Sequence, residues 1–249
     1  MKIIATSDIH GNLPEIPPCD VVCLCGDIVP LMVQRNAIES IAWLSGPFQK
    51  WALNLPCEKV IMIWGNHDFI GERLMKYGAT DGGSITFPFG YNGSKQHDLI
   101  FQNDIDEKIV ILCDEQYEYK GKVFYGTPWC PNLSSWAFYK DSEGLKDKFI
   151  HIPYETDVLL THCPPKFGQQ GVVLETNWNF GTDFGCQELQ DAMEHAFKFK
   201  KVPTYILSGH IHSGNHNMES DIYKNFYYRN VSLLNENYEV AYKPFEFDI

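Results

Sequence analysis

The clearest pattern in the sequence is a short apolar run that stops at a glycine and continues in polar residues. One such run, Val60–Trp64, is followed by Gly65 and then by Asn66, His67 and Asp68. Short runs of branched apolar residues are typical of buried strands, and glycine marks the point where the chain turns. A buried polar group without a partner is costly, so polar side chains at such a strand end need partners. We therefore predict that this strand ends in a polar site.

Four more apolar runs are built in the same way, starting at Lys2, Asp20, Thr156 and Thr204. The polar side chains that suit a metal site at the five strand ends are Asp8, His10, Asp27, Asn66, His67, Asp68, His162, His210 and His212. Ligands of open α/β sheets bind beyond the carboxyl ends of the strands, so we expect these side chains to meet. Five of the nine histidines belong to this set, which argues against a scatter of surface histidines.

Helical spacing separates these runs. Arg35–Leu55 and Gln187–Lys200 each place apolar residues on one side of a helix, and the first of them is interrupted near Gly46 and Pro47. Phe69–Tyr77 is predicted as a shorter helix. The alternation of apolar runs with helical segments favours the α/β class.

Further strands are predicted outside the five runs. Ile109–Leu112 and Lys122–Tyr125 are expected to pair through a polar turn around Tyr117–Gly121. The aromatic tail Phe226–Ile249 is expected to add antiparallel strands. Residues 78–98 are rich in glycine and polar residues without a period, so we predict a surface loop that can form one wall of the site.

Length and composition narrow the class of protein. The 249 residues suit one large α/β domain, and no linker or repeat divides them, so we predict a single domain over residues 1–249. Asp and Glu number 32 against 20 Lys and Arg, and the resulting charge of −12 disfavours long nucleic acid as a partner. No apolar run reaches the roughly 20 residues that span a bilayer, so no membrane association is expected.

The compartment and the state of the cysteines are predicted together. The first residues lack the apolar segment of a secretory signal, which favours a cytoplasmic location. Several of the eight cysteines lie inside apolar runs, so we expect reduced packing residues rather than disulfides. Cys23 and Cys25 alternate along one strand and are expected to share a face.

The order of the polar motifs carries a resemblance to a known family. Asp-x-His, Gly-Asp, Gly-Asn-His-Asp, a later His and Gly-His-x-His resemble the signature of calcineurin-like metallophosphoesterases, and here they span Ser7–His212. The resemblance implies an α/β fold, a four-layer α/β/β/α sandwich of two mixed sheets flanked by helices. It also implies two metal ions, the first held by Asp8, His10, Asp27 and His212, the second by Asp27, Asn66, His162 and His210. Asp27 would bridge the two ions.

Weaker motifs are similar to one subgroup of that family. Gly126–Trp129 together with Trp136–Phe138, and the ending Pro244–Asp248, resemble the metallophosphoesterase-domain (MPPED, 239FB-like) subgroup. The first motif departs from that subgroup, because Asp8–Asn12 is closer to the style of protein phosphatases.

The chemistry implied by the resemblance is hydrolysis of a phosphate ester. Carboxylate, imidazole and amide ligands suit transition metals, so we expect two divalent or trivalent ions, manganese first, with iron, zinc or nickel as alternatives. A hydroxide that bridges them would attack phosphorus. His67 would stabilise the phosphoryl charge or protonate the leaving group, and Asp68 would orient it or merely cap a turn. Asn12 and Trp129 are candidate substrate contacts, with turn formation and core packing as their alternatives.

The predicted function is hydrolysis of small-molecule phosphodiesters, with cyclic nucleotides among the candidates. The alternatives are a phosphomonoesterase or a Ser/Thr protein phosphatase. An alternative of another class is a non-catalytic scaffold with this fold, which the intact His67 and ligand positions disfavour. The oligomeric state stays open. The remaining histidines receive no role; these are His97, His151, His195 and His216.

Overall fold

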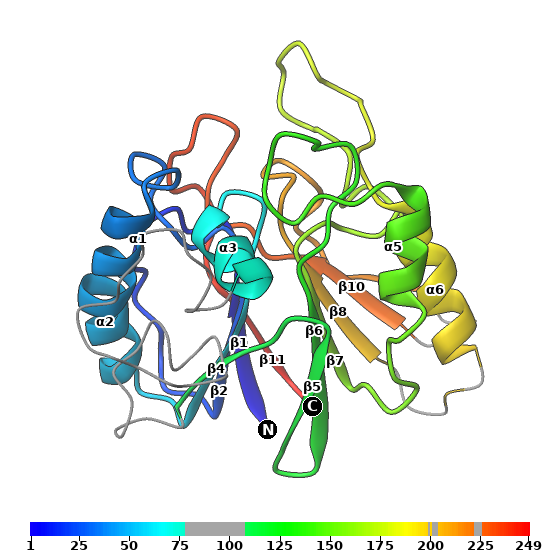
Figure 1. Cartoon of the computed structure of the whole chain (residues 1–249). Coiled ribbons are helices and arrows are strands. Elements are labelled where there is room, and N and C mark those ends of the chain that lie inside the picture. Colours follow the sequence, from blue (N-terminus) through cyan, green and yellow to red (C-terminus); the bar gives the residue numbers. More distant parts are fainter. Residues whose placement is uncertain (78–107, 199, 201–203, 222–225) are drawn as a thin grey trace.

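The computed structural model describes residues 1–77, 108–198, 200, 204–221 and 226–249 of the chain. In these residues two β-sheets lie face to face, and helices cover the outer side of each sheet (Figure 1). Both sheets combine parallel and antiparallel strands. The predicted four-layer α/β/β/α sandwich of two mixed sheets is confirmed. The loop predicted over residues 78–98 and His97 lie outside the described residues.

The first sheet holds three of the five predicted apolar runs. Its described strands, in spatial order, are β11 (Phe245–Asp248), β1 (Lys2–Thr6), β2 (Val21–Cys25), β3 (Lys59–Ile63) and β4 (Ile109–Ile111). Strands β1 to β4 run parallel, and β11 is antiparallel to β1 as predicted for the tail. All five residues of β2 are buried. Because both faces of these strands are covered, their sequences are apolar runs rather than an alternation.

The second sheet holds the other two runs. Its described strands, in spatial order, are β5 (Glu115–Tyr119), β6 (Lys122–Thr127), β7 (Val158–Thr161), β8 (Thr204–Ser208), β10 (Phe226–Asn230) and β9 (Glu219–Asp221). Strands β6, β7, β8 and β10 are parallel, and the edge strands β5 and β9 are antiparallel to their neighbours. The tail therefore contributes a parallel strand, β10, as well as the antiparallel β11.

One predicted strand pair is wrong. The strand over Ile109–Leu112 belongs to the first sheet, where β4 pairs with β3, whereas β6 pairs with β5 in the second sheet. The residues assigned to a polar turn, Tyr117–Gly121, in fact include the end of β5. Three of the five residues of β5 are exposed, because it is an edge strand. Its polar composition therefore hid it from the hydrophobic pattern.

The helices divide between the two outer layers. Over the first sheet lie α1 (Ala37–Trp43), the π-helical turn η1 (Leu44–Phe48), α2 (Gln49–Asn54) and α3 (Phe69–Tyr77); over the second lie α5 (Ser142–Phe149) and α6 (Gln187–Phe197) (Figure 1). The predicted interruption near Pro47 is the π-helical turn, which accommodates a residue without an N–H donor. Helix α5 was not expected, because it buries only Leu145 and Phe149.

Alternate residues of the strands pack in two separate apolar clusters. Ile3 of β1 and Cys23 and Cys25 of β2 face the second sheet, where Phe124 and Leu160 belong to the same cluster. The intervening residues pack beneath the helices. All eight cysteines are free, and Cys23 and Cys25 share a face, as predicted. No helix in the described part of the chain is both long and apolar enough to span a membrane.

Candidate metal centre

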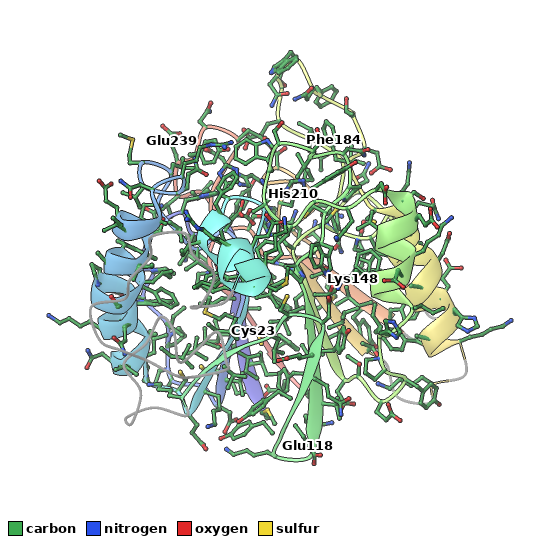
Figure 2. All side chains as sticks on the ribbon, viewed as in Figure 1. Cys23, Glu118, Lys148, Phe184, His210 and Glu239 are labelled. Atoms are coloured by element: carbon green, nitrogen blue, oxygen red, sulfur yellow. The ribbon has the colours of Figure 1, made fainter. Side chains whose placement is uncertain are left out.

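The predicted polar side chains meet where the carboxyl ends of the parallel strands of both sheets come together. Asp8 and His10 follow β1, Asp27 follows β2, and Asn66 and His67 follow β3, while the second sheet contributes His162 after β7 and both His210 and His212 after β8. Figure 2 shows His210 near the middle of the molecule, above Cys23 of the first sheet. Together with Asp68, which follows His67, these are the nine predicted residues, and five loops bring them together.

The backbone at these loops is unusual. Asp8, His10, Asp27 and His210 have φ angles of +52°, +40°, +54° and +69°. Residues other than glycine rarely adopt this left-handed conformation, and it tends to persist at functional sites that the surrounding structure over-determines. Glycine precedes three of the motifs, at Gly26, Gly65 and Gly209, because the chain segments pass so close: a Cβ at Gly65 would lie 2.2 Å from Asp27 Oδ1.

Asp27 lies at the centre of the cluster. Its Oδ2 is 3.5 Å from His10 Nε2, 3.3 Å from His162 Nε2 and 3.9 Å from His67 Nε2. Its Oδ1 accepts a hydrogen bond of 2.8 Å from the backbone N–H of His67. Burial acts to raise the pKa of Asp27, but the charges of His162 and His67 hold it well below its usual value. One carboxylate oxygen therefore faces imidazoles from both sheets.

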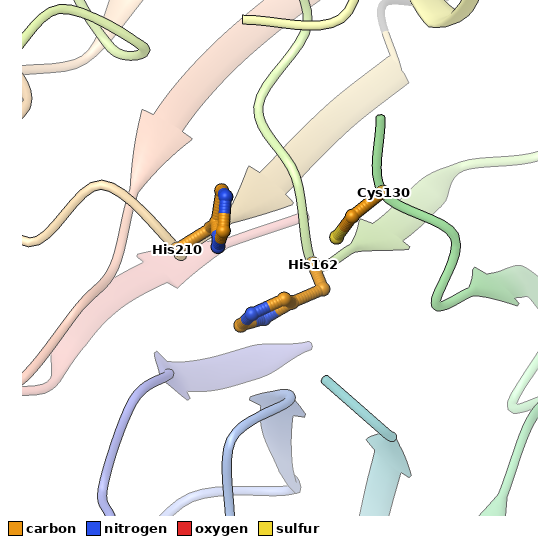
Figure 3. Close-up of side chains that lie close together, drawn as sticks. All are labelled: Cys130, His162 and His210. Atoms are coloured by element: carbon orange, nitrogen blue, oxygen red, sulfur yellow. The ribbon is translucent and has the colours of Figure 1, made fainter. Parts of the chain in front are cut away.

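One side of the cluster is formed by an amide and two imidazoles. Asn66 Oδ1 lies 2.8 Å from His162 Nε2 and 2.9 Å from His210 Nδ1. His162 Nδ1 lies 2.8 Å from the carbonyl oxygen of Cys25 and donates to it, so Nε2 is the nitrogen left to act as a ligand. Figure 3 shows the two imidazoles with the thiol of Cys130 beside them.

The other side is formed by Asp8 and His212. His212 Nε2 is 3.4 Å from Asp8 Oδ1, and His212 Nδ1 donates to the carbonyl oxygen of Asn235 at 2.8 Å. Asp8 Oδ2 accepts from Ser232 Oγ at 2.8 Å and from the N–H of His210 at 3.0 Å. A carbonyl acceptor on the far ring nitrogen again turns Nε2 toward the centre, the arrangement typical of metal-binding histidines.

His10 gives the most direct indication that the cluster fits a cation. It is 7% exposed, and neither of its ring nitrogens has a hydrogen-bond partner in the described part of the chain. Burial lowers the pKa of His10 to about 4, so the ring is neutral and has a lone pair to offer. Buried polar atoms normally have a hydrogen-bond partner or bind an ion. A neutral imidazole beside carboxylates is well suited to be a metal ligand.

The described residues contain overlapping donor sets whose atoms lie within 4.8 Å of one another. Three of the sets contain carboxylates: Asp8 with His10 and His212, His10 with Asp27 and His67, and Asp8 with Asp27 and His162. A fourth joins Cys130 to His162 and His210. These mixed nitrogen and oxygen donors suit divalent transition metals.

His67 is held differently from the expectation. Its Nδ1 lies 2.6 Å from Gln34 Oε1, and its ring packs against Trp136 with 4.4 Å between ring centroids. Burial lowers the pKa of His67. Gln34 therefore fixes the tautomer of the imidazole, with Nδ1 donating and Nε2 directed toward Asp27. No pattern in the sequence predicts the hydrogen bond from His67 to Gln34 or the packing of Trp136 on the His67 ring.

Asp68, expected either to orient His67 or to cap a turn, makes the contacts of the second alternative. Its buried carboxylate accepts hydrogen bonds from the backbone N–H groups of Ile28, Val29 and Gly65, at 2.8–3.0 Å for the shortest bond to each. Asp68 thus ties the loop after β2 to the loop after β3, and Gln34 takes the contact with His67 that was assigned to it.

Replacing Asp68 with alanine should lower the free energy of unfolding by about 3 kcal/mol, because three buried N–H donors lose their acceptor. The measurement is urea denaturation followed by circular dichroism. Asp68→Asn is the matched variant: its amide oxygen still accepts, so we expect a smaller loss of about 1 kcal/mol. Equal losses in the two variants would contradict the tying role.

The two expected substrate contacts lie in structural positions. The Asn12 side chain donates to the carbonyl oxygen of Ile9 at 2.9 Å, which is the turn alternative. Trp129 is 2% exposed, and its Nε1 donates to the Asp114 carboxylate at 2.8 Å. Trp129 is therefore a core residue in the structure, and the aromatic side chain beside His67 is Trp136.

The histidines without a predicted role divide in a simple way. His151 and His195 are exposed on the surface. His216 contacts the backbone of a candidate ligand: its Nε2 donates to the carbonyl oxygen of His212 at 2.8 Å, and its ring stacks on Tyr242. Tyr238 is a neighbour of the centre that the motifs did not indicate, with its ring 5.1 Å from both His10 and His212.

Comparison with known proteins agrees with this arrangement. Residues 1–214 match the family model described as calcineurin-like phosphoesterase. A UPF0046 protein of Caenorhabditis elegans is 29% identical over the whole of this chain, which spans 60% of that relative's length. Metallophosphoesterase domain-containing protein 1 of Homo sapiens is 25% identical over the whole chain, which spans 71% of its length. The chain belongs to the calcineurin-like phosphoesterase family and is similar to its metallophosphoesterase-domain (MPPED-like) members.

Proposed function

We propose that the protein is a dinuclear-metal phosphoesterase that hydrolyses small-molecule phosphodiesters. The family and the cluster of histidines and aspartates support a metal-dependent phosphoesterase. The observation that carries the dinuclear proposal is the position of Asp27 Oδ2, which lies within 3.5 Å of ring nitrogens from both sides of the cluster.

The proposed ligand sets are those that the family resemblance implies. Asp27 belongs to both sets, joined on one side by Asp8, His10 and His212 and on the other by Asn66, His162 and His210. Manganese is the proposed metal, because the mixed oxygen and nitrogen donors suit it. Bound there, two divalent ions would supply Lewis-acid catalysis and an activated water.

His67 is the proposed acid of the reaction. Gln34 Oε1 accepts from Nδ1, so any proton carried by Nε2 is directed toward the centre, where the leaving oxygen of a bound ester would lie. An alkoxide leaving group benefits from a proton more than a good leaving group does. The presence of this histidine beside the cluster therefore favours diesters over a phosphomonoesterase or protein-phosphatase activity.

The net charge and the cysteines of the protein favour a small substrate and a reducing compartment. A charge of −12 disfavours long nucleic acids, and eight free cysteines are typical of proteins kept under reducing conditions. We therefore propose the cytoplasm as its location.

Turnover of bis-p-nitrophenyl phosphate should exceed that of p-nitrophenyl phosphate in the protein loaded with Mn²⁺, and chelation should remove it. The measurement is release of p-nitrophenolate with each ester at equal concentration, before and after treatment with EDTA and after adding Mn²⁺ back. Turnover of the monoester alone would replace the proposal with a phosphomonoesterase. No turnover of either ester with Mn²⁺, Fe²⁺, Ni²⁺ or Zn²⁺, despite full loading, would favour a non-catalytic binding protein.

A further inference from the structure

A turn near the end of the chain reaches the candidate centre. It comprises residues 235–239 and lies beyond the segment that matches the family model, which ends at residue 214. Tyr238 in this turn is 43% exposed. Its ring centroid lies 5.1 Å from those of His10 and His212 and 6.3 Å from that of His67. Tyr238 is therefore both at the centre and open to solvent.

The turn holds Tyr238 in a costly conformation. Its φ of +61° is unusual for a large side chain. Asn235 stabilises this geometry, because its Oδ1 accepts from the N–H groups of Asn237 and Glu239 at 3.0 Å each. Its carbonyl oxygen also accepts from the Tyr238 N–H at 2.9 Å. Strain of this kind persists where the structure over-determines it, and it clusters at functional sites.

Hydrogen bonds join the same turn directly to the loop after β8. The carbonyl oxygen of Asn235 accepts from His212 Nδ1 at 2.8 Å. Glu236 Oε1 accepts from the Ser213 N–H at 2.9 Å and from its hydroxyl at 2.8 Å. Figure 2 labels Glu239, the last residue of the turn. These bonds set the position of Tyr238 relative to the histidine side chains.

The ring of Tyr238 stands upright against the centre. Its plane makes angles of 74° and 85° with the imidazoles of His10 and His212. Trp136 packs on His67 at 4.4 Å, so the two aromatic side chains border different parts of the centre. If His67 protonates the leaving group, Trp136 lies on the side of that group. Tyr238 is nearer to His10 and His212, at 5.1 Å, than to His67, at 6.3 Å, so on the proposed geometry it is the better placed of the two rings to meet the ester group that stays on phosphorus.

We propose that Tyr238 is a specificity-determining residue whose ring packs against a planar, aryl group retained on phosphorus after the reaction. This inference rests on the proposed phosphodiesterase activity and adds a substrate class to it, namely phosphodiesters with an aromatic ester group. Aromatic rings pair with one another with a modest preference beyond the area they bury, which is enough for selectivity without being required for chemistry.

The test compares two esters with the same leaving group. Bis-p-nitrophenyl phosphate and methyl p-nitrophenyl phosphate both release p-nitrophenolate, and they differ only in the retained group. We expect Tyr238→Ala to lower the ratio of their kcat/KM values, aryl over methyl, about three- to tenfold, mainly through KM. Tyr238→Phe should keep the ratio within about twofold, because it keeps the ring. Tyr154→Ala, which removes an exposed tyrosine outside the site, is the control.

Two results would overturn the proposal. One is an equal loss for both esters in Tyr238→Ala, which would mean that the residue acts on the metal centre as a whole. The other is an unchanged ratio in a folded variant with full metal content. If the wild-type protein hydrolyses neither ester, the proposed function fails. Calorimetric binding of diphenyl phosphate and dimethyl phosphate then decides this inference, because equal affinities in the wild-type protein would reject it.

Discussion

The Asp27→Asn variant should lose bound metal and all measurable turnover of a phosphodiester. Asparagine has the size of aspartate and can still accept the His67 N–H, so we expect the fold to remain. It lacks the charge that faces His10 and His162 at 3.5 and 3.3 Å. A residue that merely orients a ligand typically contributes about 10- to 100-fold to metal affinity, and a residue shared by both proposed ligand sets should contribute more.

Metal content after loading with Mn²⁺ and removal of free ions, measured by mass spectrometry beside the turnover assay, checks this expectation. The matched control is Asp191→Asn, which removes an exposed carboxylate from α6 and should match the wild-type protein in both measurements. A folded Asp27→Asn protein with full metal content and full turnover would reject the central position assigned to this residue.

The His67→Asn variant should lower kcat about 10²- to 10⁴-fold for diesters with poor leaving groups, the usual contribution of a positioned general acid. The loss should be smaller for p-nitrophenyl esters, because p-nitrophenolate leaves without a proton. Metal content should be retained, since His67 is outside both proposed ligand sets. Rates across a series of esters with leaving groups of increasing pKa, together with metal analysis, give both quantities.

The structure also allows His67 to be a metal ligand, and the same variant tests this alternative. His67, His10 and Asp27 lie close enough to share an ion. Loss of metal from His67→Asn would make His67 a ligand rather than an acid. A loss of turnover that does not depend on the leaving group would also contradict the acid role. His195→Asn, an exposed histidine on α6, is the control.

The errors in the predicted fold come from strands and helices that bury few residues. β5 has the sequence Glu-Gln-Tyr-Glu-Tyr, and its residues are exposed or only partly buried, so it lacked an apolar signal. Without it, the strands at Ile109 and Lys122 seemed to be neighbours, although they belong to different sheets. Helix α5 likewise buries only two residues, so the hydrophobic pattern does not predict it. Hydrophobic periodicity reports burial, so elements at an edge leave little trace in it.

In the candidate site, the proposed metal ligands could be predicted from the sequence, but their hydrogen-bond partners could not. The residues proposed to hold metal follow buried parallel strands directly, so their common position could be predicted from strand ends alone. The partners of those residues could not. Gln34 reaches His67 from 33 positions away, and Ser232 reaches Asp8 from 224. Such contacts depend on how loops from both sheets meet, and no local pattern records that.

The sequence by itself determined the α/β class, the five strand ends and the set of acids, amide and imidazoles that they carry, because burial and turn chemistry are local properties. Only the tertiary structure decided which groups each polar side chain contacts there. It made Asp68 a tie between two loops, put Trp129 in the core, and brought Trp136 and Tyr238 to the centre. Those roles depend on distances between segments far apart in the chain, which only packing establishes.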